Sequence, residues 1–233
     1  YGGKKSITQL DDSAFANVTT ANEKGIYKTT DDLGVSYYYR GAVNNNWVKF
    51  GKDENQNDMY WRIIRINGDG SVRMIYSGVT DPSTDSSVIN SNGVYMTGTT
   101  TQIGTGVFNT NFDKAEYVGY QYIEGQQHGY GKCDGANASC TVNGQTVYNS
   151  TIKQTIDKWY VGTSLTDNDV SKIADAIYCN DRSASSTQTT AWKSTEVEYY
   201  YGAYGRLNIN KNPILTCPEE SDKFTVSESL GNG

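Results

Sequence analysis

The clearest pattern of apolar and polar positions lies between Val35 and Tyr76, where β-branched and aromatic residues form short runs separated by turn residues. The two strongest runs are residues 59–66 (MYWRIIRI) and 71–76 (SVRMIY). They flank Asn67-Gly68-Asp69-Gly70, in which Asn-Gly and Asp-Gly supply the positive-φ positions that a tight hairpin needs. This stretch therefore predicts an antiparallel β-hairpin.

Weaker runs predict further strands before the hairpin. They combine strand-forming residues with flanking turn residues, and they occupy residues 25–29, 35–40 and 47–50. With the hairpin they predict a meander of four or five antiparallel strands in the first third of the chain. Residues 1–24 are polar and are expected to form a separate segment, with a weak helical pattern over 11–22.

The chain then becomes irregular. Residues 77–106 lack a regular apolar period and predict a long loop, which is uncommon unless it serves a function. One strand followed by a loop is expected within residues 113–131. A small hairpin is expected to turn at Asn143-Gly144, and a last strand is expected over residues 222–227.

Helical patterns occur only in the second half. A first helix is expected after the N-cap candidates Asn149-Ser150, with an apolar face formed by Ile152, Ile156 and Trp159. A second is expected to begin at Thr166 or Asp167, with an acidic first turn and an apolar face formed by Val170, Ile173, Ala174 and Ile177. The predicted fold class is α+β: an antiparallel β meander, two short helices and long irregular loops, in one domain over residues 25–233.

Composition and charge narrow the class of protein. The chain has 233 residues, including 19 tyrosines and 24 glycines, which favours strands and turns. Its net charge of -6 argues against binding to nucleic acid or to an anionic membrane surface. No apolar run approaches the length of a membrane span. Because the chain begins at Tyr1 rather than at a methionine, we expect a processed form or a fragment that has lost an export signal or anchor.

The four cysteines favour disulfides over a metal site. Cys133 and Cys140 bracket a polar loop of suitable length for a local bridge, which leaves Cys179 and Cys217 as the second pair. Four cysteines allow three connectivities, so this pairing is a preference. Zinc is the competing interpretation, but the sequence has no CxxC motif. We expect no metal and no cofactor, and an oxidising, extracellular setting.

Few residues in the sequence are candidates for catalysis. His128 is the only histidine, and it lies in the polar stretch Gly125-Gln126-Gln127-His128-Gly129, which predicts an exposed loop histidine. No G-x-S-x-G motif marks a nucleophile. We therefore predict that the chain is not an enzyme.

Two carboxylate-rich segments are candidate calcium sites, at residues 53–58 (DENQND) and 167–169 (DND). Neither follows the EF-hand spacing, so turn and cap roles are the simpler explanation. The three Asn-x-Ser/Thr sequons, at Asn17, Asn137 and Asn149, carry little information if the source is bacterial.

The high number of tyrosines is the most distinctive feature of the composition. They combine a large contact area with a hydroxyl group, which suits stacking on carbohydrate or contact with a protein. Alternation along strands nevertheless places about half of such side chains in the core. The candidates are Tyr37, Tyr38, Tyr39, Tyr117, Tyr120, Tyr122, Tyr199, Tyr200, Tyr201 and Tyr204.

Several segments together resemble a family of secreted proteins from gut Firmicutes. They are YYYRGAVNNNWVKF, YWRIIRINGDGSVRMIY, NSTIKQTIDKWY, YCNDRS, YYGAYGRL and LTCPEESDKFTVS, and they cover nearly all of residues 25–230. Several members of that family carry a pilin-like export helix or a cell-wall anchor. The order of hairpin and helices is similar to the first half of the formylglycine-generating-enzyme and C-type-lectin-like fold.

The resemblance implies a secreted or surface-attached module, and it implies no catalytic residue in this chain. The chain ends where the second half of the family's fold would begin. Three explanations stay open: a cut or processed chain, remaining strands supplied by another polypeptide, or a self-sufficient domain.

Two functions are consistent with these patterns. The first is an extracellular or cell-surface binding or adhesion module without catalytic activity, which uses the loops at 77–110 and 180–205. Its partner would be a host or bacterial surface protein or glycan. The alternative is a pilin-like structural subunit that assembles with itself into a surface filament. Neither function involves nucleic acid or membrane insertion of this segment.

Overall fold

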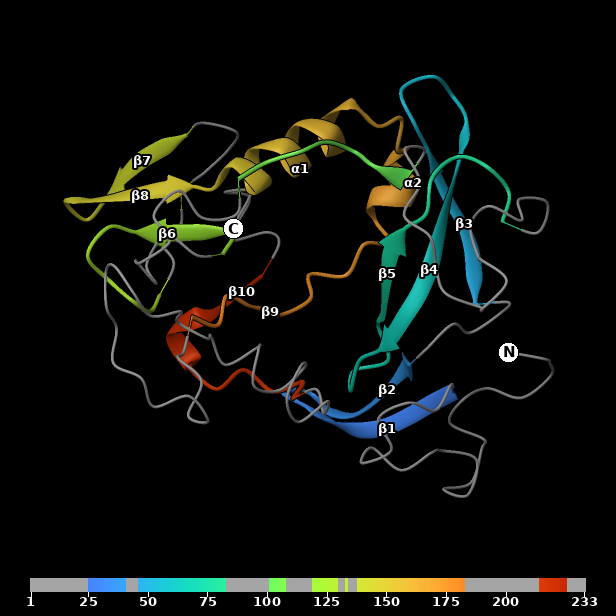
Figure 1. The fold of residues 1–233 in the computed structure, drawn as a ribbon. Coiled ribbons are helices and arrows are strands. Elements are labelled where there is room, and N and C mark those ends of the chain that lie inside the picture. Colours follow the sequence, from blue (N-terminus) through green and yellow to red (C-terminus); the bar gives the residue numbers. More distant parts are fainter. Residues whose placement is uncertain are drawn as a thin grey trace, which may run out of the picture. The chain divides into compact units, whose positions relative to one another are not determined.

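A computed structural model describes residues 25–40, 46–82, 101–107, 119–129, 133, 138–182 and 214–225. The chain divides into two compact units, each formed by two separate stretches. Unit 1 comprises Tyr1–Ile103 and Gly162–Ala174, and unit 2 comprises Gly104–Val161 and Asp175–Gly233. Among the described residues, antiparallel sheets dominate both units and two short α-helices accompany them, so the class is α+β (Figure 1). The single domain over 25–233 stays a prediction, as does the helix over 11–22, which lies outside the described residues.

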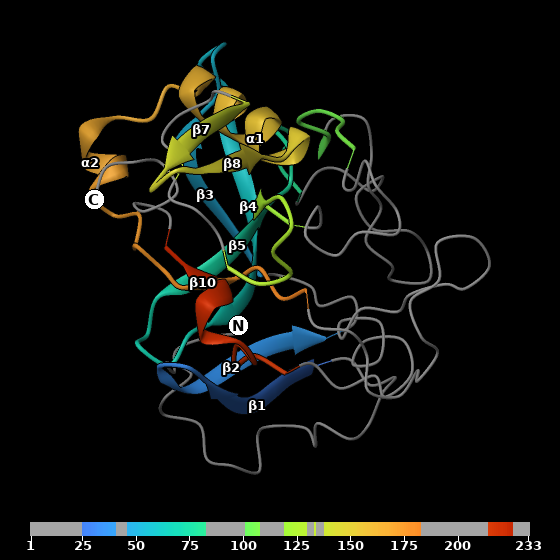
Figure 2. The same ribbon diagram turned by 90° about the vertical axis from the view of Figure 1, so that its left-hand side faces the viewer.

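A five-stranded antiparallel sheet forms unit 1. Its strands are β1 (Gly25–Asp31), β2 (Gly34–Arg40), β3 (Trp47–Lys52), β4 (Asp58–Ile66) and β5 (Val72–Tyr76). All of these strands were predicted, but they are not joined as a sequential meander. The long strand β4 pairs with β5 along one edge and with both β3 and β2 along the other (Figures 1 and 2). The nine residues of β4 give that second edge enough length for two partners.

The predicted hairpin at residues 59–76 is confirmed, although its turn differs from the expected one. Asn67 N donates to Ser71 O at 2.8 Å, and Gly70 N donates to Asn67 O at 2.9 Å. Gly70 has a φ of 86°, whereas Asn67, Gly68 and Asp69 have no positive φ. The turn is therefore a wider loop that ends in a left-handed glycine, not a two-residue turn with two positive-φ positions.

Close packing between turns explains why residue 68 is glycine. A Cβ atom at Gly68 would lie 2.4 Å from Gly34 N and 2.5 Å from the carbonyl carbon of Leu33. Asp31 bridges the same two turns, because its carboxylate accepts from Leu33 N at 2.8 Å and from Gly68 N at 3.0 Å. The β1–β2 turn and the β4–β5 turn are thus fixed to one another.

The packing of unit 1 involves its sheet and a second chain segment, Gly162–Ala174. Tyr27 and Tyr38 stack with ring centroids 5.6 Å apart, and both are buried. Gly51, at a φ of 71°, forms part of an irregularity in β3, and its missing Cβ leaves space for Leu165. Met59 is fully buried at the same place.

In unit 2 a small sheet contains β6 (Gln121–Ile123), β7 (Ser139–Val142) and β8 (Gln145–Asn149), in the order β6-β8-β7. The predicted hairpin between β7 and β8 is confirmed, and both turn residues have positive φ: 51° at Asn143 and 81° at Gly144. A small apolar core of Ile123, Cys133 and Val147 lies beside this sheet.

The end of the chain adds a second, shorter ladder to unit 2. There β9 (Tyr178–Cys179) pairs with β10 (Lys223–Phe224), which directly follows the 3-10 helix η6 (Glu220–Asp222). β10 confirms the start of the strand predicted at 222–227. Residues 226 and 227 lie outside the described part.

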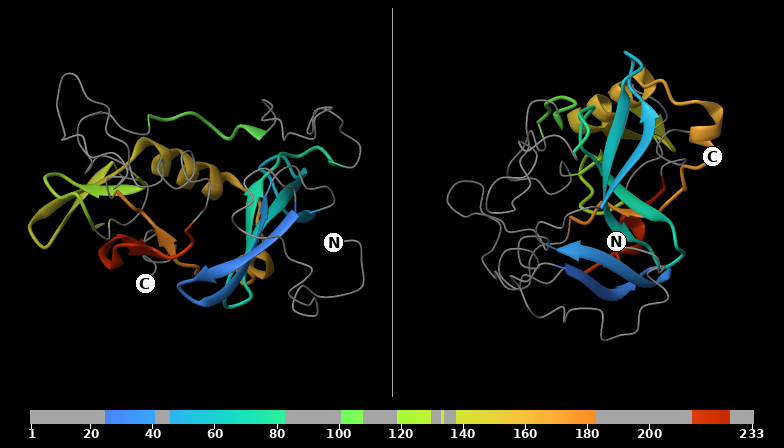
Figure 3. Two further views of the ribbon diagram at one scale, coloured as in Figure 1. Left: turned by 60° about the horizontal axis from the view of Figure 1, so that its bottom comes forward. Right: turned by 90° about the vertical axis from the view of Figure 1, so that its right-hand side faces the viewer.

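The helix α1 (Thr151–Gly162) follows β8 directly (Figures 1 and 3). Ser150 caps it as predicted, because its hydroxyl accepts from Lys153 N at 3.1 Å. The predicted buried face is wrong. Ile156 is exposed and Ile152 is only half-buried, while the buried side chains are Lys153 and Asp157.

The second helix, α2 (Asp167–Val170), begins where predicted but is much shorter than expected. Thr166 and Asp169 form a capping box, which fixes the start. Val170 and Ile173 are both exposed, so the predicted apolar face has no packing to extend the helix. Among the described residues, no helix is long and apolar enough to cross a membrane.

Candidate functional site

Both predicted disulfides form, and both lie in unit 2. Cys133 pairs with Cys140 and Cys179 pairs with Cys217, with Cα atoms 5.7 and 5.5 Å apart. The first bridge closes a local loop, and the second joins β9 to the segment before η6. Disulfides persist in oxidising compartments, so the pairing favours such an environment.

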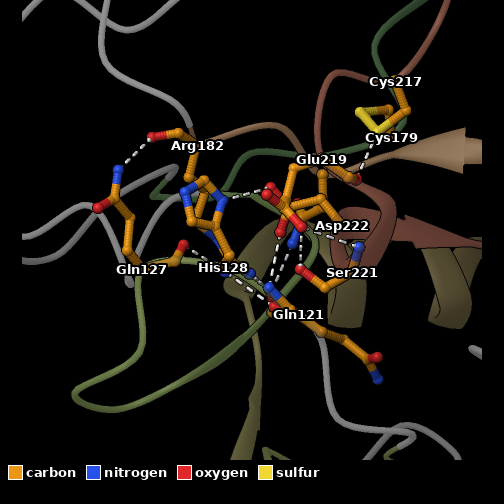
Figure 4. Close-up of polar contacts among 11 residues, drawn as sticks. Gln121, Gln127, His128, Cys179, Arg182, Cys217, Glu219, Ser221 and Asp222 are labelled. Carbon is orange, nitrogen blue, oxygen red and sulfur yellow. Dashed lines mark hydrogen bonds and ion pairs between the residues drawn. A yellow bond between two sulfur atoms is a disulfide. The ribbon is translucent and has the colours of Figure 1, made fainter.

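Four polar side chains lie near the second disulfide, and we call them the polar cluster: the half-buried His128 and the buried Asn180, Arg182 and Asp222. Figure 4 shows His128, Arg182 and Asp222 with the disulfide. Asp222, in η6, is fully buried. Its carboxylate accepts from His128 Nδ1 at 2.9 Å and from Gly129 N at 2.7 Å. The loop after β6 is thereby attached to the C-terminal segment.

Arg182 attaches the same loop to the segment after β9. It is fully buried, and its Nη1 donates to the carbonyl oxygens of Gln127 at 3.0 Å and Gly129 at 2.8 Å. Its Nη2 donates to the carbonyl oxygen of Gln121. Gln127 Nε2 donates back to Arg182 O at 3.3 Å. A planar guanidinium suits this role because its donors are held in a fixed fork.

Asn180 completes the cluster. Its side-chain amide accepts from Tyr120 N at 2.8 Å and donates to Gln121 O at 2.7 Å, so it pairs with backbone at the start of β6. Its own backbone N donates to Asp222 O at 2.8 Å. A Cβ at Gly119 would lie 1.8 Å from Asn180 Oδ1, which explains the glycine there.

His128 therefore differs from the exposed loop histidine that was predicted. Its side chain is 33% exposed and bonded to a buried carboxylate. The 2.9 Å contact between His128 Nδ1 and Asp222 Oδ2 fixes the orientation of the imidazole ring. In η6 the Ser221 hydroxyl donates to Glu219 Oε1 at 2.9 Å. That bond holds the pKa of the Glu219 carboxyl below its ordinary value.

The sequence alone did not single out Asn180, Arg182 or Asp222. Their only signal is position, since Asn180 directly follows Cys179 and Asp222 lies shortly after Cys217. A disulfide holds the residues beside one of its cysteines close to the residues beside the other cysteine. Polar side chains there are candidates for fixing the loops that the bridge joins.

A second group of buried polar residues, which we call the lysine site, lies on the inner side of α1. Lys153 is fully buried, and its Nζ lies 2.5 Å from Asp157 Oδ2. Tyr120 donates its phenol proton to Asp157 Oδ1 at 2.8 Å, and the Lys153 Nζ lies 5.3 Å from the centre of its ring. All three residues belong to unit 2.

The candidate calcium segments have structural roles. Asp53 accepts from Asn55 N at 2.9 Å and Asn57 N at 2.8 Å, which closes the β3–β4 turn. Asp58 binds Lys49 and Lys52, and Asp169 belongs to the capping box of α2. Within the described ranges, no three His, Cys, Asp or Glu side chains are grouped to hold a metal ion.

The predicted tyrosines divide between core and surface. Tyr38 is buried, while Tyr37, Tyr39, Tyr120 and Tyr122 are half-buried. Tyr122 stacks on Tyr148 with ring centroids 5.1 Å apart. The remaining candidates lie outside the described residues: Tyr117, Tyr199, Tyr200, Tyr201 and Tyr204. So do the sequons at Asn17 and Asn137, whereas Asn149 is buried and accepts from Gln121 Nε2.

Comparison with known proteins gave no relatives: no family model matches the chain, and neither does any curated protein or solved structure. The resemblance to the secreted Firmicutes family therefore stays a prediction.

Proposed function

We propose that this chain is an extracellular or cell-surface binding module without catalytic activity, whose ligand is a protein or glycan on another surface. Its scaffold would be C-type-lectin-like, as the sequence resemblance implies. The two disulfides support a place outside the cell, because small loop-rich modules in oxidising settings are commonly cross-linked in this way.

The observation that carries the proposal is the polar cluster. Three segments distant in sequence (119–129, 178–182 and 217–224) are joined by buried side chains and a disulfide instead of by long strands. Irregular segments held rigidly on a scaffold are a common basis for binding sites.

An aromatic column in unit 2 is the best candidate for contact with the ligand. Phe224 stacks on Tyr120 at 5.5 Å and on Tyr178 at 5.8 Å between ring centroids. Tyr178 is 38% exposed, so part of its ring faces solvent. A tyrosine ring held by stacking loses little conformational entropy when a sugar or a protein side chain packs on it.

Binding of the labelled chain to bacterial and epithelial cells tests the proposal. We expect saturable binding, and protease or periodate treatment of the cells distinguishes a protein ligand from a glycan. Tyr178→Ala is expected to weaken binding at least about tenfold. Val161→Ser is the control, because Val161 is 80% exposed and lies on α1, which contributes none of the three rings of the aromatic column.

Two results would contradict the proposal. One is the absence of saturable binding to every cell type with a folded, monomeric chain. The other is the growth of ordered polymers with concentration, seen in electron micrographs. That second result would favour the pilin-like filament subunit.

A further inference from the structure

We propose that Lys153 and Asp157 become covalently joined by an amide bond between their side chains. The lysine site would thus be a place of self-modification, and this does not depend on the binding function. The two residues lie four apart on α1, a spacing that places side chains on the same face of a helix. Nζ and Oδ2 are 2.5 Å apart, which places Nζ beside the carboxyl group whose carbon it would attack.

Burial is the first reason to expect the reaction here. The Lys153 side chain has no exposed surface, and that of Asp157 is only 6% exposed. A buried ion pair carries the unfavourable free energy of removing two charges from water. An amide bond removes both charges and keeps one donor and one acceptor, so the product is better suited to the same site than the reactants.

The surrounding groups match the steps of the condensation. The amine nitrogen attacks the carboxyl carbon of Asp157, and a C–N bond forms while the C–Oδ2 bond breaks. The ammonium nitrogen gives up two protons in total, and both leave with Oδ2 as one water molecule. Oδ2 is the oxygen nearest to Nζ, so the departing oxygen lies beside its proton donor.

Tyr120 stabilises the other oxygen. Its phenol donates to Oδ1 at 2.8 Å, where negative charge develops when the carboxyl carbon becomes tetrahedral. Oδ1 then remains as the carbonyl oxygen of the amide. The phenol is held in place because Tyr120 N donates to Asn180 Oδ1 and the ring stacks on Phe224. The donor is therefore oriented before the reaction begins.

The chain also contains an internal control. Lys223 and Glu220 are likewise 2.5 Å apart, but the Glu220 side chain is 84% exposed. Water stabilises that ion pair and competes for the carboxylate, so we expect no amide there. The nitrogen–oxygen distance is the same in both pairs, but only the Lys153–Asp157 pair is buried.

Mass spectrometry of the reduced and denatured full chain tests the proposal. We expect the mass to be lower by one water molecule, with the loss located by fragmentation within residues 153–157. Trypsin should fail to cleave after Lys153 but should cleave after Lys158 and Lys223. An unmodified mass overturns the proposal. A water loss placed at Asp69-Gly70 also overturns it, because that would be cyclisation at a turn.

Three variants separate the chemistry from folding. Lys153→Arg keeps the positive charge but cannot form the amide, and its two disulfides, seen by mass before reduction, show that it folds. Tyr120→Phe should form the bond more slowly. Asp157→Asn should lose ammonia instead of water and give the same product. A full mass for Asp157→Asn together with a water loss in Lys153→Arg would exclude this pair as the site.

Discussion

Single residues in unit 1 decide how closely its turns approach. The Asp31 carboxylate accepts hydrogen bonds from backbone N–H groups of both the β1–β2 and the β4–β5 turn, and Gly68 leaves no side chain between them. Arg65 lies near the same carboxylate, with Nη2 3.4 Å from Asp31 Oδ2. Small changes here affect two hairpins at once.

Replacing each of two glycines of one turn by alanine should therefore lower the free energy of unfolding by different amounts. Gly68→Ala places a methyl group against backbone atoms of the other turn and should lower the free energy of unfolding by about 3 kcal/mol. Gly70→Ala meets no atom within 4 Å and has only an unfavourable φ of +86°, so its loss should be about 1 kcal/mol. Urea denaturation measures both. Equal losses would contradict the packing that we describe between the turns.

Residue identity predicted some of these roles and missed others. The cysteine pairs followed from loop length, and Gly70 followed from turn chemistry. Gly68 was assigned to its own turn, whereas its constraint comes from Gly34, which is far away in sequence. The polar cluster was missed for the same reason, since Arg182 and Asp222 become partners of the 119–129 loop only after folding.

At the scale of elements, strands were easier to predict than helices. Alternating apolar residues and turn signals located β1 to β5, because each strand has partners close in sequence. The face of α1 was wrong because hydrophobic periodicity assigns lysine and aspartate to solvent. Lys153 and Asp157 are buried instead, because their opposite charges pair with one another.

Acid sensitivity should be detectable in the β3–β4 hairpin. Hydrogen bonds from Lys49 and Lys52 hold the pKa of Asp58 below its ordinary value of 3.8. A depressed carboxyl pKa adds stability above the unfolded value, and this stability is lost as pH falls through the folded value. The free energy of unfolding of Asp58→Asn should therefore fall less steeply than that of the wild type as the pH drops below 3.8. Because Asp58 is on the surface, salt should reduce the difference, and urea midpoints at neutral and acid pH measure it.

At the scale of the whole molecule, covalent cross-links are confined to one unit among the described residues. Both disulfides lie in unit 2, while unit 1 depends on its sheet and on Leu165. This division was not visible in the sequence, because the return of residues 162–174 to unit 1 depends on packing between distant segments.

Reduction of the disulfides should therefore affect the units unequally. The chain-entropy model gives a loss of about 4 kcal/mol for the loop of 38 residues and about 2 kcal/mol for the loop of 7. Hydrogen exchange with and without reductant should show faster exchange in β6 to β10 and little change in β1 to β5. Cys179→Ala/Cys217→Ala is the matched variant for the larger loop. Faster exchange in β4 to the same extent as in β8 would show instead that the units unfold together.

The space that Gly51 leaves for Leu165 has a consequence for synthesis. A ribosome releases the strands β1 to β5 long before it reaches residue 165. During that interval Met59, fully buried in the finished protein, lacks the side chain that later packs beside it. We therefore expect the nascent sheet to stay incompletely packed until Leu165 itself has been made, and a stall just before Leu165 should leave Met59 more exposed.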